Sequence, residues 1–209
     1  MCIEARVVEV ISNHMNEHWE RVAGVLVGPK REGWFTSESF VALSQNVNPL
    51  EDDGFSVYGE QALSTVLNRV GWSPAGGEPR RFPDLVGYFP DATEPLAFIL
   101  EAKLIYVDDP NPQRVLDNLA GQLANAHEVV PGVPVIGLVF IASSPAPGDA
   151  SSEIERLGSL METCLPSAEG YSWVDGNRVS VLSELDQARP DWESFNCYST
   201  LAIGARVRS

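Results

Sequence analysis

A long apolar run that contains a charged pair constrains this chain more than any other feature of its sequence. Residues 96–107 have few polar interruptions apart from Glu101 and Lys103. A run of this kind predicts a strand that is covered on both faces, at the centre of a sheet. Because an unpaired buried charge is costly, the two charged residues in the middle of the strand require partners or a function.

A shorter apolar run lies on the other side of a segment rich in Pro, Asp and Thr, which predicts a β-hairpin. A hairpin tip at Ala92 and Thr93 places Asp84 opposite Glu101. Directly opposed positions have Cβ atoms about 5 Å apart, and Glu101 and Lys103 share one face because side chains alternate along a strand. The hairpin therefore predicts a cluster of two carboxylates and one ammonium group inside the sheet.

Two carboxylates at that separation repel each other unless a cation lies between them. A hard cation with oxygen ligands, Mg²⁺ or Mn²⁺, fits such a site, and the lysine can orient or deprotonate a water or stabilise a developing negative charge. The structural alternative is a buried salt bridge between Glu101 and Lys103, with Asp84 capping a turn. We favour the metal site, because buried ion pairs contribute little net stability and the third charge then has no reason of its own.

The pair Pro83-Asp84, a variable hairpin and the triplet Glu101-Ala102-Lys103 resemble the PD-(D/E)XK motif of the restriction-endonuclease-like nuclease superfamily. The resemblance implies an α/β fold with a mixed central β-sheet flanked by helices. It implies that Asp84 and Glu101 ligate Mg²⁺ or Mn²⁺ and that Lys103 completes the catalytic set. The activity it implies is metal-dependent hydrolysis of DNA phosphodiester bonds. Because the chain is acidic, we expect it to be a nuclease subunit of a defence or repair system that a basic partner brings to DNA.

The resemblance also implies an acidic residue on the helix that precedes the Asp strand. We expect that helix to run from residue 57 or 58 to 70, with Glu60 in its first turn as a third metal ligand. Glu38, in the helix before it, is the second choice. A first-turn carboxylate that interacts with the helix dipole is an equally good interpretation of Glu60.

Two accessory residues complete the predicted site. Members related to the RecB nuclease carry a Gln and, four residues later, a Tyr on the helix after the Lys strand; here Gln122 is followed at that offset by Ala126. Half of that feature is missing, so an exposed helix glutamine is the alternative for Gln122. Arg81, close to Asp84 in the sequence, can contribute to a local basic patch.

The charge of the chain leaves a second class of function open. The 209 residues include 14 Lys and Arg against 29 Asp and Glu, a net charge of −15. Because nonspecific DNA affinity comes from neutralising phosphates, such a protein repels DNA unless a local patch or a basic partner compensates. The alternative function is therefore a non-catalytic binding or assembly protein with a nuclease-like fold, whose acidic surface contacts a basic protein partner. Small-molecule hydrolysis at the same metal site is a third, weaker option.

The cysteines and the terminal sequence predict a cytoplasmic protein. Cys2, Cys164 and Cys197 are far apart and have no metal-binding spacing, which suits a reducing compartment. The N-terminus lacks the features of a signal peptide, and no apolar run approaches the roughly 18 residues that span a membrane.

The chain is predicted to divide into residues 1–54, a helical N-terminal extension, and residues 55–209, an α/β core with C-terminal hairpin additions. The extension is expected to serve oligomerisation, substrate or partner contacts, and its His14 and His18 are expected on the surface. The pattern of apolar residues predicts further elements: helices at 5–25, 36–47, 113–129 and 152–164, a central strand at 135–142, a hairpin at 171–182 and an edge strand at 198–207.

Overall fold

The computed structural model describes most of the chain up to residue 147 and three later strands. The described residues are 3–18, 21–22, 25, 32–50, 54–61, 82–90, 96–106, 109–147, 159, 171–175, 179–182 and 197–208.

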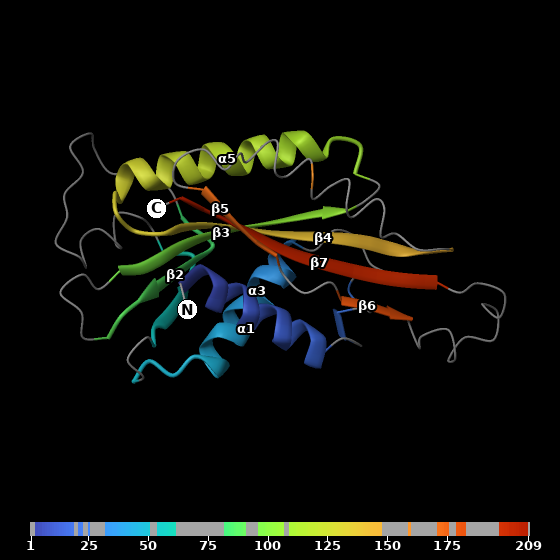
Figure 1. Ribbon diagram of the computed structural model, residues 1–209, viewed down its shortest axis with the longest axis horizontal. Helices are drawn as coiled ribbons and strands as arrows, with labels where there is room; N and C mark the ends of the chain where they lie inside the picture. The colour runs from blue at the N-terminus through green and yellow to red at the C-terminus, as the bar shows by residue number, and fades with distance from the viewer. Residues whose placement is uncertain are drawn as a thin grey trace.

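The described strands form one mixed, seven-stranded sheet in the order β1-β2-β3-β4-β7-β5, with β6 also paired to β7 (Figure 1). The chain is therefore an α/β protein with a mixed central sheet, as the sequence predicts. The strands are β1 (Ser56–Gly59), β2 (Leu85–Tyr88), β3 (Leu96–Tyr106), β4 (Val135–Pro147), β5 (Tyr171–Asp175), β6 (Val179–Leu182) and β7 (Cys197–Arg208). The helices are α1 (Ile3–Glu17), α3 (Glu32–Asn46) and α5 (Pro112–Val129).

The predicted hairpin is confirmed. Strands β2 and β3 are antiparallel, with Leu85 opposite Leu100, so the next position along the ladder brings Asp84 to Glu101. The pairing slips by one residue between Gly87 and Tyr88, towards the hairpin tip. Because the slip lies at the end of β2 nearest the hairpin tip, it does not disturb the register at the other end of the strand, where Asp84 faces Glu101.

The central position of β3 is also confirmed. It pairs with β2 on one side and with β4, in parallel, on the other, and Glu101 lies opposite Gly137. Helix α5 connects the two parallel strands, as a crossover connection requires. Every residue of β3 is buried except Lys103, which is partly exposed.

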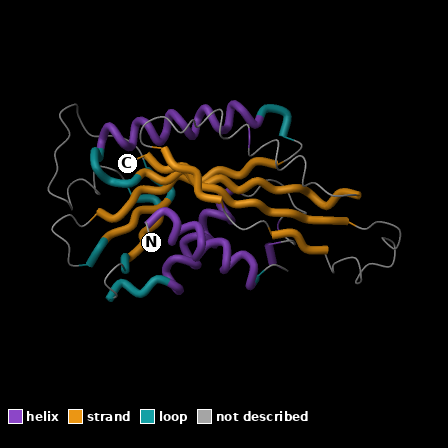
Figure 2. Tube along the Cα trace, in the orientation of Figure 1, coloured by secondary structure: helices purple, strands orange, loops and turns teal. Residues whose placement is uncertain are grey.

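Helices cover both faces of the sheet. Helix α5 lies on one face, and α1 and α3 lie on the other (Figures 1 and 2). Side chains of β3 alternate between the two layers: Leu100 and Leu104 belong to the cluster with α1 and α3, whereas Ile99 and Ile105 belong to the cluster with α5. This alternation assigns Glu101 and Lys103 to the α5 face of the strand.

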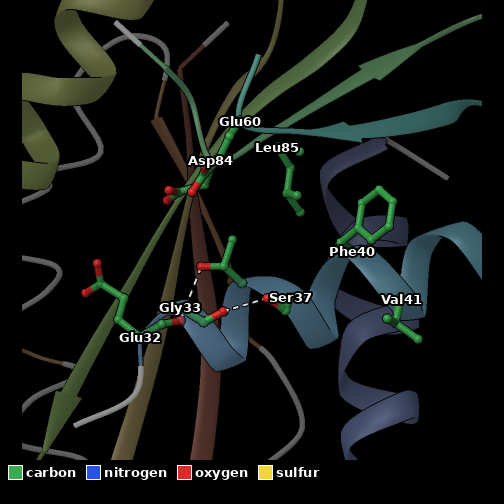
Figure 3. A pocket seen from close by; sticks show the side chains of 10 residues that line it. Glu32, Gly33, Ser37, Phe40, Val41, Glu60, Asp84 and Leu85 are labelled. Carbon is green, nitrogen blue, oxygen red and sulfur yellow. Dashed lines mark hydrogen bonds between the residues drawn. The ribbon is translucent and has the colours of Figure 1, made fainter. Parts of the chain in front are cut away.

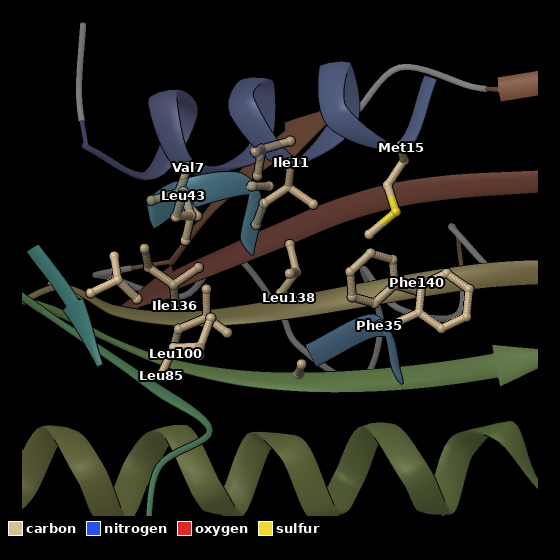
Figure 4. Close-up of a cluster of buried hydrophobic side chains, with 14 of the residues drawn as sticks. Val7, Ile11, Met15, Phe35, Leu43, Leu85, Leu100, Ile136, Leu138 and Phe140 are labelled. Atoms are coloured by element: carbon tan, nitrogen blue, oxygen red, sulfur yellow. The ribbon is translucent and has the colours of Figure 1, made fainter. Parts of the chain in front are cut away.

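The two N-terminal helices share a hydrophobic core with the sheet. Val7 and Ile11 of α1 and Phe35 of α3 are fully buried in the same cluster as Leu138 and Phe140 of β4 (Figure 4). The rings of Phe35 and Phe140 lie 4.8 Å apart between centroids. The helices predicted as an extension are thus packed on the sheet, while the domain boundary at residue 54 stays a prediction.

The predicted helix from residue 57 or 58 to 70 is wrong at its start. Ser56–Gly59 is strand β1, antiparallel to β2 with Val57 opposite Gly87. Phe55 and Val57 are buried whereas Tyr58 is exposed, so the short stretch follows the period of a half-buried strand rather than that of a helix. Residues 62–70 lie outside the described part of the chain.

Helix α3 begins at Glu32, four residues before the predicted start, where Thr36 or Ser37 was expected to cap the helix. The Thr36 hydroxyl donates to the carbonyl of Glu32 at 3.3 Å, and the Ser37 hydroxyl donates to the carbonyl of Gly33 at 2.8 Å. Both hydroxyls therefore bond back within the helix instead of capping it. The earlier start brings Glu32 into the first turn.

The C-terminal strands pair differently from the prediction. Segments 171–175 and 179–182 are strands, but each pairs with β7 and they run along it in the same direction. No reversal at Asp175 is involved, because β7 has 12 residues and accommodates both. Strand β7 therefore lies inside the sheet, between β4 and β5, and the predicted edge position is wrong. The predicted helix at 152–164 falls almost wholly outside the described residues.

The prediction of surface histidines is half correct. His18 is exposed, whereas only 3% of His14 is exposed. The His14 Nε2 atom lies 3.0 Å from Oε2 of Glu38 on α3, and Arg21 bonds to the same oxygen. The histidine is buried because it connects α1 to α3, so spacing along one helix was not sufficient to predict its environment.

Candidate functional site

The candidate site lies at the N-terminal end of β2, next to Leu85. Pro83 precedes the strand and has no backbone N–H, so it cannot donate to the sheet. The Oδ2 atom of Asp84 accepts the backbone N–H of Ala102, on the facing edge of β3, at 2.7 Å. The carboxylate thus occupies the edge of β3 that a longer β2 would cover.

A second carboxylate continues this pattern. Glu32, in the first turn of α3, accepts the backbone N–H of Leu104 on Oε2 at 3.3 Å. Its Oε1 accepts the Lys103 ammonium at 2.8 Å, and that ammonium also donates to the carbonyl of Ala102 at 2.8 Å. The uncovered edge of β3 is therefore bonded by two carboxylates and one ammonium group.

Glu60 reaches the same place from β1. It follows the last paired residue of β1, and its N–H donates to the backbone carbonyl of Asp84 at 3.0 Å. Its φ of 40° places it in the left-handed region, which costs a residue with a side chain about 1–2 kcal/mol. A strained non-glycine residue at a pocket is an observation that favours a functional role.

The acidic residues line one pocket of about 640 Å³ (Figure 3). Glu32 and the adjoining residues of α3 form one wall, and Glu60, Asp84 and Leu85 form the opposite one. Figure 3 shows the side chains of Asp84 and Glu60 on one side of the pocket and that of Glu32 on the other. The remaining lining residues are Gly33, Thr36, Ser37, Phe40, Val41 and Gly59.

Burial raises the pKa of Asp84 above its ordinary value of 3.8, and this is the largest effect on the group. The Ala102 hydrogen bond and the Lys103 charge lower that pKa, while the charges of Glu32 and Glu60 raise it further. The net direction is upward. Three carboxylates line the pocket, and the Lys103 ammonium bonds to one of them, Glu32. Neighbouring carboxylates repel each other, and a cation between them relieves the repulsion.

Glu101 lies beside this group in a less polar environment. Only 3% of it is exposed. Its partner in the β4 ladder is Gly137, where an added Cβ would meet methyl groups of Leu123 and Leu119 at 2.8 and 3.3 Å. Leu119 and Leu123 of α5 thus pack against the sheet at the position next to Glu101, which explains why Glu101 is buried.

The other predicted residues have separate outcomes. Gln122 is on α5 with its Oε1 buried, so the alternative of a simply exposed helix glutamine does not describe it. Glu38 bonds to His14 and Arg21 rather than lining the pocket. Arg81 lies outside the described residues. The sequence pattern does not indicate Glu32 as a site residue, because it predicts that the helix starts at residue 36 and not at Glu32.

The carboxylates of the pocket could hold a hard cation only if water or substrate supplied most of its ligands. Within the described residues, no group of three or more His, Cys, Asp and Glu side chains is arranged to hold a metal ion. Mg²⁺, however, usually keeps several waters and binds through one or two carboxylates together with substrate phosphates. Asp84 and Glu60 supply such a pair of oxygen donors, and Glu32 faces them across the pocket.

Comparisons with protein-family models, with curated proteins and with solved structures each gave no significant match. None of the helices in the described part of the chain has the length and apolar character needed to cross a membrane.

Proposed function

We propose that this chain is a metal-dependent nuclease of the restriction-endonuclease-like superfamily, which hydrolyses DNA phosphodiester bonds in the cytoplasm as part of a defence or repair system. One observation carries the proposal. The Asp84 carboxylate and the Lys103 ammonium come from the two halves of the sequence motif, and they bond to backbone groups of the same residue, Ala102, at one edge of β3. A pocket adjoins them.

Each residue has a role in this proposal. Asp84 and Glu60 hold Mg²⁺ or Mn²⁺. Glu101 is the motif carboxylate that lies buried beside them, outside the pocket lining. When bound, the cation supplies charge neutralisation for the phosphate. Lys103 orients the attacking water and stabilises negative charge on the phosphoryl oxygens. Glu32 is a positioning residue, because its bond to Nζ keeps the lysine ammonium at the edge of the strand.

The test is cleavage of plasmid and of single-stranded DNA at low salt, with Mg²⁺ and then Mn²⁺. We expect Asp84→Asn and Lys103→Ala to lose cleavage by at least about 100-fold, the scale of one lost electrostatic stabiliser. Asp117→Asn, on the exposed side of α5, is the matched control and should cut like the wild type. Cleavage at the wild-type rate by both site variants would reject this site.

The second candidate is a binding or assembly protein that uses the same fold without catalysis. Two observations favour it: the net charge of −15, and the fact that Asp84 and Glu32 accept backbone N–H groups of β3, which gives both residues a structural reason to be present. A basic protein partner would complement the acidic surface. Stoichiometric recovery of such a protein, with no cleavage in any divalent metal, would favour this function over the nuclease.

A further inference from the structure

Two exposed aromatic side chains, those of Tyr58 and Phe82, lie close in the sequence to carboxylates that line the acidic pocket. Among the described residues, the large hydrophobic side chains that are more than a third exposed are Phe40 (37%), Leu50 (87%), Tyr58 (41%) and Phe82 (60%). Single exposed hydrophobic residues are ordinary on protein surfaces. Tyr58 and Phe82 are different, because each lies two residues before a carboxylate of the pair Glu60 and Asp84.

The strand ladder places these two aromatic residues on opposite sides of one pair of acids. Tyr58 is two residues before Glu60, and Phe82 is two residues before Asp84. Because β1 and β2 are antiparallel and the Glu60 N–H bonds to the Asp84 carbonyl, the two segments run in opposite directions from this pair. Each aromatic residue is therefore two positions along its own segment from the acidic pair.

The Tyr58 ring is supported from behind. It meets the ring of Tyr88 in an edge-to-face contact, with centroids 5.6 Å apart and an interplanar angle of 77°. The Tyr88 hydroxyl in turn donates to Oε1 of Gln61 at 3.1 Å. Tyr88 is almost fully buried, so the contact orients Tyr58 while 41% of it stays open to solvent.

We propose that Tyr58 and Phe82 are base-stacking residues, and that the substrate is an unpaired stretch of DNA seated with one nucleotide on each side of the phosphodiester at Asp84 and Glu60. The inference rests on the proposed nuclease function and specifies its substrate class. Stacking on aromatic rings is a contact of unpaired bases, because both faces of a base are covered inside a duplex.

The charge of the chain favours the same conclusion. With a net charge of −15, the protein cannot obtain much affinity by neutralising phosphates. Stacking on aromatic rings is a source of affinity that is tolerant of sequence and does not require basic residues. Affinity that comes mainly from stacking should also depend only weakly on salt, in contrast to binding through lysine and arginine.

The test is fluorescence anisotropy of a labelled oligothymidine and of a hairpin duplex of equal length, with EDTA present to prevent cleavage. Tyr58→Leu and Phe82→Leu keep apolar bulk but remove the ring, and each should weaken binding of the single strand by about 5- to 150-fold. Tyr58→Trp should bind at least as well as the wild type. Leu50→Ala removes an exposed hydrophobic side chain that is not next to Glu60 or Asp84 in the sequence, and it should have no effect.

The outcomes separate this inference from the proposed function. If the wild type binds and cleaves DNA but both leucine variants bind the single strand like the wild type, the stacking role is wrong and the nuclease proposal stands. Equal weakening of single-strand and duplex binding would refute the unpaired substrate. If the wild type neither binds nor cleaves any of these DNAs, the proposed function itself fails, and this inference fails with it.

Discussion

Replacing Asp84 by asparagine and by alanine separates its structural role from its charge. The Oδ2 atom of Asp84 accepts the N–H of Ala102 at 2.7 Å, and Ala102 is fully buried. Alanine leaves this N–H without an acceptor, at a cost of about 1–3 kcal/mol in the free energy of unfolding. Asparagine keeps a carbonyl oxygen for the same bond and removes the charge.

The direction of the Asp84 pKa predicts that asparagine is at least as stable as the wild type at neutral pH. Burial raises that pKa, and the charges of Glu32 and Glu60 add to the effect. Between the ordinary value and the raised value, the folded protein binds more protons than the unfolded chain, so wild-type stability falls as pH rises through this range. The advantage of Asp84→Asn should therefore be largest at neutral pH and shrink as pH falls towards 3.8.

The assay is urea unfolding of the wild type and both variants at pH 7.5 and at a series of lower pH values, with Asp117→Asn as an exposed carboxylate control. For a chain of 209 residues, the alanine variant should also lose roughly 2–4 °C in melting temperature for each kcal/mol. The reasoning would be refuted if asparagine destabilised the protein as much as alanine, or if its advantage grew as pH fell.

Three further substitutions test the fold and the site. Gly87→Ala should cost about 1–3 kcal/mol in urea unfolding, because the added Cβ would lie 2.3 Å from Cε1 of the Phe98 ring; Gly137→Ala meets a movable leucine methyl and should cost clearly less, and equal losses would contradict this register. Glu60→Gly should leave stability within about 1 kcal/mol, since relief of the left-handed strain offsets the flexibility of glycine, yet it should reduce cleavage; retained cleavage would remove Glu60 from the site. Glu38→Ala should lower the unfolding free energy by about 1–3 kcal/mol, because its buried histidine partner loses an acceptor, while single-turnover cleavage by the folded fraction stays unchanged; a specific loss of cleavage would place Glu38 in the site after all.

The hairpin was predictable because two signals in the sequence agree. The length of the apolar runs defines the strands, and a tip at Ala92 and Thr93 sets the same register that the structure has at Leu85 and Leu100. A one-residue slip would have moved every side chain to the other face of the sheet. The position of Asp84 relative to Glu101 was therefore strongly constrained by the sequence alone.

The position of Glu32 in the pocket could not be predicted in the same way. Glu32 lies 71 positions before Lys103, and their contact depends on how α3 packs on the sheet. Nothing local to the sequence reports that packing. The short strand β1 was not predicted for a related reason. Four residues give too few repeats to distinguish a strand from the first turn of a helix, and only the pairing with β2 identifies the strand.

The edge of β3 also bears on why charged side chains are there at all. A sheet that only had to fold would cover the N–H groups of Ala102 and Leu104 by extending β2 by four residues, 81–84, through neutral backbone bonds. This chain places Pro83 at that point and covers the same groups with Asp84 and Glu32. Partly buried carboxylates carry a desolvation cost that backbone carbonyls do not, and the raised pKa of Asp84 is the sign of that cost. The two backbone bonds explain why acceptors are needed at this edge, but they do not explain why the acceptors are charged; the proposed role of the carboxylates in binding a cation would explain it.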